Sequence, residues 1–224
     1  MPNIFKITTY VILICWITSA ISQVDSTKLI KYTGDFKFKE GIFISFDQVK
    51  QNKPLSKSRI ITSIDIEAND FFEKITTESF ISFYDDLGLK QTIETKKIWG
   101  FSWNGTLYVQ HNKQFNRIPV IGRACHFVSE VTVYRDRFPD PYYSPYYNPA
   151  APTAYASEEL RQYLLDFNTG KIMEYDYTAL QIVLMQDVKL YDEYNAFKKR
   201  KKKQLLYQYL RKFNERNPLY FPIN

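Results

Sequence analysis

The chain has 224 residues, of which 45% are hydrophobic and 24% are charged, a composition that excludes disorder along its whole length. Two cysteines and two histidines exclude a disulfide-rich scaffold and a cysteine-rich zinc site. Aromatic residues make up 17%, glycine occurs only 7 times, and the formal net charge is +6. We therefore expect a mildly basic globular protein with a core built from large rings.

The amino terminus has the anatomy of a signal peptide. Lys6 precedes an apolar run over residues 10–17, and the small residues of Ala20-Ile21-Ser22 follow. The run is too short to cross a bilayer as a relaxed helix, although a retained membrane anchor is the alternative. We predict that residues 1–22 are removed by cleavage before Gln23, which leaves one domain over residues 23–224.

The first predicted elements are short. Residues 41–44 are typical of a strand, and Ser45 with Gln48 forms a capping box that opens a helix. Pro54 follows and ends this helix. Residues 60–66 alternate between apolar and polar side chains, which predicts a half-buried strand.

The middle of the chain predicts an antiparallel meander. Short β-rich runs are separated by turn residues, at positions 85–88, 104–105, 111–113 and 122–123. Asn104-Gly105 is the strongest of these signals, because both residues tolerate the positive φ of a two-residue type I′ turn. With this loop, three cross-strand pairs follow: Trp103 with Thr106, Phe101 with Tyr108, and Trp99 with Gln110. Ile98, Gly100, Leu107 and Val109 then lie on the opposite face.

Residues 138–155 contain five prolines and many tyrosines, which predicts a long irregular loop. Beyond it, Asn168-Thr169-Gly170 separates two apolar runs and predicts a hairpin with a three-residue loop.

The carboxy-terminal part, residues 178–216, is predicted to be helical. Thr178 with Gln181 forms a second capping box, and Asp187 opens a long helix that runs to about Asn214. Asn217-Pro218 ends it. The predicted fold is therefore α+β, an antiparallel meander or barrel-like sheet followed by a helical segment.

The aromatic face of the predicted hairpin is the sharpest candidate binding site. Rings on a rigid hairpin suit stacking against sugar rings or apolar groups, but aromatic residues on strands also build cores. The residues concerned are Trp99, Phe101, Trp103 and Tyr108. If these rings are open to solvent, the binding hypothesis is favoured.

A basic run is the second candidate. It consists of Lys198, Lys199, Arg200, Lys201, Lys202 and Lys203, and favours a polyanion such as lipid headgroups or an acidic glycan. Export argues against nucleic acid as the partner. The alternative is a plain solvated helix.

Enzymatic chemistry has weaker support. Cys125 and His126 are adjacent, but successive residues of a strand point to opposite faces, so we expect Cys125 to be a core residue. A hydrolase of glycans or peptides would instead need a pair of carboxylates. The acids considered for that role are Asp85, Asp86, Glu94 and Glu130. Neither a metal site nor a cofactor is predicted, and His111 and His126 lack metal-ligand spacing.

Several short motifs carry a resemblance. They are residues 41–46, 97–101, 168–172, 190–191, the basic run and residues 212–217. On these motifs the chain is similar to a family of exported bacterial proteins from Gram-negative species. The chain resembles this family, whose function is unknown, so the resemblance implies a location in the periplasm, the cell envelope or outside the cell, and no activity. The leading hypothesis is a non-enzymatic interaction module whose partner is an envelope protein or glycan, or which contacts an anionic membrane surface peripherally.

Overall fold

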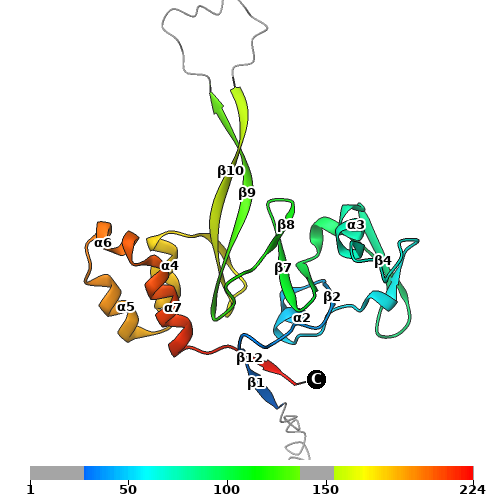
Figure 1. Ribbon diagram of the computed structural model, residues 1–224, viewed down its shortest axis with the longest axis horizontal. Coiled ribbons are helices and arrows are strands. Elements are labelled where there is room, and N and C mark those ends of the chain that lie inside the picture. The colour runs from blue at the N-terminus through cyan, green and yellow to red at the C-terminus, as the bar shows by residue number, and fades with distance from the viewer. Residues whose placement is uncertain (1–27, 137–153, 224) are drawn as a thin grey trace, which may run out of the picture.

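The structure, a computed structural model, describes residues 28–136 and 154–223, which form an α+β fold with helices gathered in the carboxy-terminal part (Figure 1). The predicted fold class is confirmed. The strands form four separate antiparallel sheets, and none of them closes into a barrel within these residues. One sheet joins the two ends of the described chain, by pairing β1 (Leu29–Lys31) with β12 (Tyr220–Pro222).

The central sheet confirms the predicted hairpin. Its strands, in spatial order, are β2 (Gly41–Phe43), β6 (Gly100–Trp103), β7 (Thr106–His111) and β8 (Gln114–Arg117). Asn104 and Gly105 have φ of 50° and 72°, and the register pairs Phe101 with Tyr108 as predicted. Asn112 and Lys113, at φ of 53° and 65°, turn the chain again before β8.

Helix α2 (Phe46–Lys50) begins where the sequence predicts. The Ser45 hydroxyl accepts a hydrogen bond from the Gln48 N–H, and the Gln48 side-chain oxygen accepts one from the Ile44 N–H at 2.6 Å. The first bond satisfies an orphan N–H of the helix, and the second ties the helix to the end of β2.

A third sheet interrupts the predicted meander. It contains β3 (Ile60–Ile61), β4 (Phe80–Tyr84) and β5 (Lys90–Glu94), packs near α3 (Phe71–Thr77), and is flanked by 3-10 helices at Lys57–Arg59 and Thr95–Lys97. The strand predicted over residues 60–66 is wrong beyond Ile61. The Thr62 hydroxyl accepts from the Ile64 N–H and the Asp65 carboxylate from the Glu67 N–H, so side chains replace the strand ladder and turn the chain.

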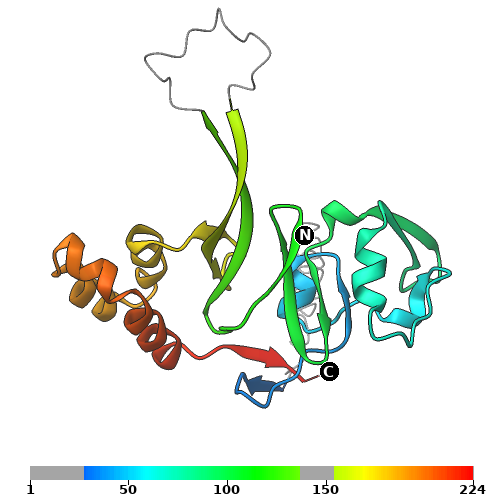
Figure 2. The same cartoon turned by 45° about the horizontal axis from the view of Figure 1, so that its top comes forward.

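A long two-stranded ribbon projects from the body (Figures 1 and 2). Strands β9 (Ala124–Asp136) and β10 (Ala154–Asp166) pair continuously over 13 residues each, and β11 (Ile172–Glu174) pairs only with the base of β10. The predicted hairpin around 168–170 is confirmed, with Gly170 at φ 77°, but its loop is longer than the three residues predicted and runs over residues 167–171. Of the loop predicted over 138–155, residues up to 153 lie outside the described residues, and β10 already begins at Ala154.

The carboxy-terminal helices correct two predictions. The helices are α4 (Tyr177–Leu184), α5 (Val188–Asn195), α6 (Lys199–Gln204) and α7 (Leu206–Arg216). Asp176, not Thr178, caps α4, because its carboxylate accepts from the Thr178 and Ala179 N–H groups. Asp187 caps α5 as predicted, through the Leu190 N–H.

The single helix predicted from Asp187 to Asn214 is wrong. Lys198 has an extended backbone (φ −65°, ψ 152°), so the chain folds back between α5 and α7. This places Tyr194 and Tyr209 together at 4.8 Å between ring centroids in one buried cluster. A straight helix would carry the apolar residues of α7 away from the body, and their burial stabilises the broken form.

Three apolar clusters hold these parts together. One lies between the central sheet and the base of the ribbon, a second between the ribbon and the helices, and a third between the central sheet and the α3 region. Leu107 and Val109 belong to the first and Phe101 to the third, so the hairpin is apolar on both faces, as predicted. Among the described helices, none has the length and hydropathy required to cross a bilayer.

Candidate functional site

The structure brings together three of the four rings predicted to share one face. Phe101, Trp103 and Tyr108 lie with the third cluster, and Phe101 is only 6% exposed while Trp103 and Tyr108 are half-buried. Trp99 packs instead beside the first cluster, with its ring 5.6 Å from the Phe46 ring. Ile98, predicted on the face opposite Phe101, lies with Phe101 in the third cluster. The reason is that a 3-10 helix ends at Lys97, directly before these two residues, and β6 begins only at Gly100. The strand alternation of side chains therefore does not extend back to Ile98 and Trp99.

The two half-buried rings border a groove of about 470 Å³, which we call the aromatic groove. Its other wall comes from α3 and the residues before it, including Asp70 and Glu73, while Phe115 of β8 completes the aromatic side. The sequence could not associate these acids with the hairpin, because α3 lies far from β6 and β7 along the chain. The rings are thus partly core and partly open to the groove.

The basic run lies on α6 and the residue before it. The side chain of Lys202 is held by the Asn195 side-chain oxygen at 2.7 Å, and the Lys199 ammonium lies 5.3 Å from the centre of the Tyr177 ring. None of the six cations forms an ion pair with an acid of the described chain. Lys198, Lys199, Arg200, Lys201 and Lys203 are exposed.

The distal part of the ribbon is a feature that sequence reasoning missed. We define the outer ribbon as residues 128–135 of β9 with 156–162 of β10, and the ribbon base as residues 124–127 with 163–166. Tyr134 is 75% exposed, Leu160 is 71% exposed, and the register places both on the same face with Val128. The sequence did contain a signal for this strand, because apolar side chains recur at every second position in most of the segment from Cys125 to Val133. Such a pattern predicts a strand but not how far the strand extends beyond the body of the protein.

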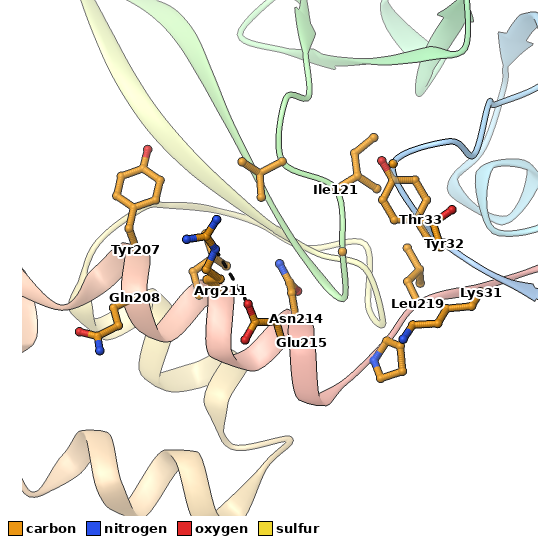
Figure 3. A pocket seen from close by; sticks show the side chains of 15 residues that line it. Lys31, Tyr32, Thr33, Ile121, Tyr207, Gln208, Arg211, Asn214, Glu215 and Leu219 are labelled. Carbon is orange, nitrogen blue, oxygen red and sulfur yellow. Dashed lines mark ion pairs between the residues drawn. The ribbon is translucent and has the colours of Figure 1, made fainter.

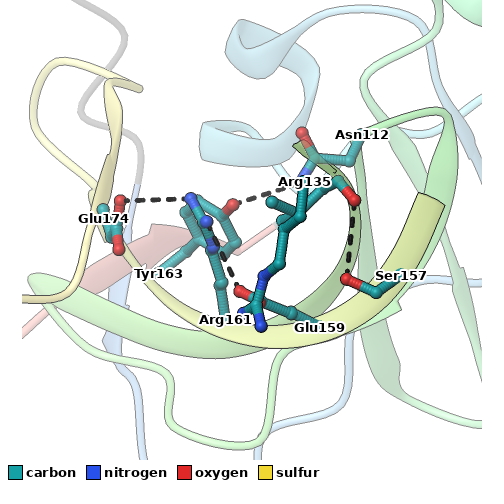
Figure 4. A network of polar contacts seen from close by, with 8 residues as sticks. Asn112, Arg135, Ser157, Glu159, Arg161, Tyr163 and Glu174 are labelled. Atoms are coloured by element: carbon teal, nitrogen blue, oxygen red, sulfur yellow. Dashed lines mark hydrogen bonds and ion pairs between the residues drawn. The ribbon is translucent and has the colours of Figure 1, made fainter. Parts of the chain in front are cut away.

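The opposite face of the outer ribbon carries a chain of ion pairs (Figure 4). Arg135 bonds to Glu159, whose other oxygen lies 3.5 Å from Arg161, and Arg161 reaches Glu174 on β11 at 3.9 Å. The two faces therefore differ: one is tied by ion pairs within the ribbon, and the other presents Val128, Tyr134 and Leu160 among polar residues that include Glu130. Glu158, on the same face as Tyr134 and Leu160, has no ion-pair partner in the described part of the chain.

A groove of about 700 Å³ separates α7 from the residues around Tyr32 (Figure 3). Tyr207, Arg211 and Asn214 face it from α7, and Ile121 faces it from the connection before β9. Next to it, His126 donates from Nε2 to the Gln162 side-chain oxygen at 3.0 Å, and the Tyr207 hydroxyl lies 3.2 Å from the same nitrogen. Burial lowers the pKa of His126, although the bond to Gln162 opposes this, so the ring is neutral at pH 7.

The residues considered for catalysis each have a defined environment. Cys125 is fully buried in the first cluster, as predicted, and burial raises the pKa of its thiol to about 12, whereas His126 lies on the opposite face. Hydrogen bonds from Lys96 and Lys97 lower the pKa of Glu94 to about 2. The Leu89 N–H and the Gln91 amide lower the pKa of Asp85. Both acids stay ionised at neutral pH and cannot donate a proton.

The two other acids have separate partners. Asp86 forms an ion pair with Arg59 at 2.6 Å, and Glu130 accepts from Gln114 at 3.5 Å. Within the described residues, no three His, Cys, Asp or Glu side chains cluster as a metal site would require. Comparisons with protein-family models, with curated proteins and with solved structures found no match.

Proposed function

We propose that this protein is an interaction module of a bacterial cell envelope, exported by its amino-terminal signal peptide, and that the outer ribbon is the element that contacts its partner. The observation that carries this proposal is the exposure of Tyr134 and Leu160 on one face of a ribbon that projects beyond the body (Figure 1). Isolated two-stranded ribbons are marginally stable, so a partner that covers this face would stabilise it.

The geometry favours a protein partner. Over residues 156–161, β10 pairs only with β9 in the described part of the chain, so its second edge offers backbone N–H and C=O groups. An extended segment of another protein can add to such an edge, with apolar side chains providing specificity. The face beside that edge includes Val128 and Leu160, which together with Glu130 border a groove of about 480 Å³ against β8.

Site-specific crosslinking tests this function. A photoreactive phenylalanine analogue is placed at Tyr134 or Leu160 in cells that produce the full chain, and at Tyr84 of β4, which is 48% exposed, as the matched control. We expect one defined crosslinked product at positions 134 and 160 and none at position 84. Equal yields at all three positions, or no product on the ribbon, would overturn the proposal.

Export has its own test. Amino-terminal sequencing of the protein recovered from the envelope fraction should begin at Gln23. Recovery of the chain with Met1 intact would exclude signal-peptide cleavage and with it the proposed route.

A second candidate function rests on the basic run: attachment to an anionic membrane surface. Its support is that five of the six cations are exposed and none is paired with an acid of the described chain, so the charge is available to a polyanion. Each such cation near a membrane surface contributes about 1 kcal/mol to binding.

Vesicle sedimentation tests this candidate. Replacing Arg200, Lys201 and Lys203 with Gln should reduce binding to phosphatidylglycerol vesicles by at least about tenfold. The matched control replaces three exposed lysines outside the run, Lys90, Lys113 and Lys171, and removes the same charge. If both triple variants lose binding equally, the effect is one of net charge and the basic run is not a site.

A further inference from the structure

The aromatic groove is lined by a column of stacked rings. Phe72 and Phe101 are nearly parallel, at 2° and 5.0 Å between centroids, and Phe101 and Tyr108 are parallel to within 12° at 4.6 Å. Phe101 therefore stacks with both of the other rings. The column therefore runs from Phe72 to Tyr108.

The Phe72 end of the column already holds a cation. The Lys57 ammonium lies 5.1 Å from the centre of the Phe72 ring, and the Glu40 carboxylate holds it at 2.7 Å. The negative face of an aromatic ring attracts a cation. At this end the fold thus combines a ring face, an ammonium and a carboxylate.

The Tyr108 end has the ring and the carboxylate but no cation. Tyr108 and Trp103 are half-buried at the groove, and Glu73 lines its rim, exposed and without an ion pair in the described residues. The other acid, Asp70, is neutralised by Lys74 at 2.8 Å. No lysine or arginine of the described chain lines the groove. Glu73 therefore places a negative charge at the rim beside two half-buried rings, with Lys74 near it but not paired to it.

We propose that the aromatic groove binds a small ligand through an ammonium group, with Trp103 and Tyr108 contacting the cation and Glu73 balancing its charge. Aromatic rings recognise quaternary ammonium groups in this way. The volume of about 470 Å³ is within the range of small-molecule sites and leaves room for the rest of the ligand. A neutral sugar would also stack on the rings, but it would leave the charge of Glu73 unbalanced.

Calorimetric titration of the full chain with choline tests the proposal, because its neutral isostere 3,3-dimethyl-1-butanol has the same shape without the charge. We expect choline to bind and the isostere to bind at least about tenfold more weakly, as desolvated cation–π contacts predict. Equal affinity for the two, or binding of methyl glucoside without binding of choline, would overturn the proposal.

Variants locate the binding. Trp103→Leu should weaken choline binding by about tenfold and Glu73→Gln by about threefold. Glu67→Gln removes the same charge from an exposed residue outside the groove and should leave the affinity unchanged. Thermal unfolding of each variant separates loss of the site from loss of the fold. If Glu73→Gln binds as wild type does while folded, the carboxylate has no role and the assignment is wrong.

Discussion

The ribbon base and the outer ribbon belong to the same two strands, pair in one continuous register, and yet have opposite environments. At the base, one face packs on the helices through Leu164 and the other on the central sheet through Phe127, and both residues are fully buried. In the outer ribbon, Tyr134 and Leu160 are mostly exposed. Strand pairing alone therefore does not explain why the ribbon continues beyond the core, whereas contact with another molecule would.

The comparison predicts its largest effect at Phe127. Phe127→Ala removes a ring stacked on Tyr163 at 5.6 Å and leaves a cavity, which should lower the free energy of unfolding by about 3–5 kcal/mol. Leu160→Ala in the outer ribbon should change it by less than about 0.5 kcal/mol. Urea unfolding measures both. Similar losses at the two positions would mean that the outer ribbon is part of the cooperative core.

The next effect concerns the attachment of the ribbon base to α7. The Asn214 side chain accepts from the Ala124 N–H at 2.9 Å and donates to the Ala124 carbonyl at 2.8 Å, as a neighbouring strand would. Asn214→Ala leaves both buried groups of Ala124 unpaired and should cost about 2 kcal/mol. Glu215→Ala, on the exposed side of the same helix, is the control and should cost less than about 0.5 kcal/mol. Equal losses in the two variants would exclude this attachment.

These contacts also indicate what the sequence could and could not predict. The Asn104-Gly105 turn and the Asp187 cap were predicted correctly because their physical cause lies within a few residues. Asn214 and Ala124 are far apart in the chain, and no local pattern links them. The candidate site divides in the same way: Trp103 and Tyr108 follow from the hairpin register, whereas Glu73 reaches the groove only through tertiary packing.

The base should also respond to pH where the outer ribbon does not. Burial lowers the pKa of His126 in the folded protein, so the unfolded chain binds a proton more readily. Stability should therefore fall as the pH drops below the unfolded-state pKa of about 6.5. Urea unfolding should be measured at one pH above and one pH below this pKa. The free energy of unfolding should fall less between the two pH values for His126→Gln than for wild type. The same loss in both proteins would assign the pH dependence to other groups, among them His111, whose pKa burial also lowers.

The smallest effect is expected at the ion pairs of the outer ribbon. Arg135 and Glu159 are bonded, but the Arg135 side chain is 56% exposed, and exposed pairs contribute only about 0.2–1 kcal/mol. Arg135→Gln should therefore barely change urea unfolding, and the difference should vanish in high salt because exposed charges are screened. Its effect on crosslinking from position 134 is a separate matter. If these charges only stabilise the ribbon, Arg135→Gln should lower the crosslinking yield in proportion to the loss of hydrogen-exchange protection at the ribbon amides. If the partner binds Arg135 directly, the crosslinking yield should fall while the hydrogen-exchange protection stays unchanged.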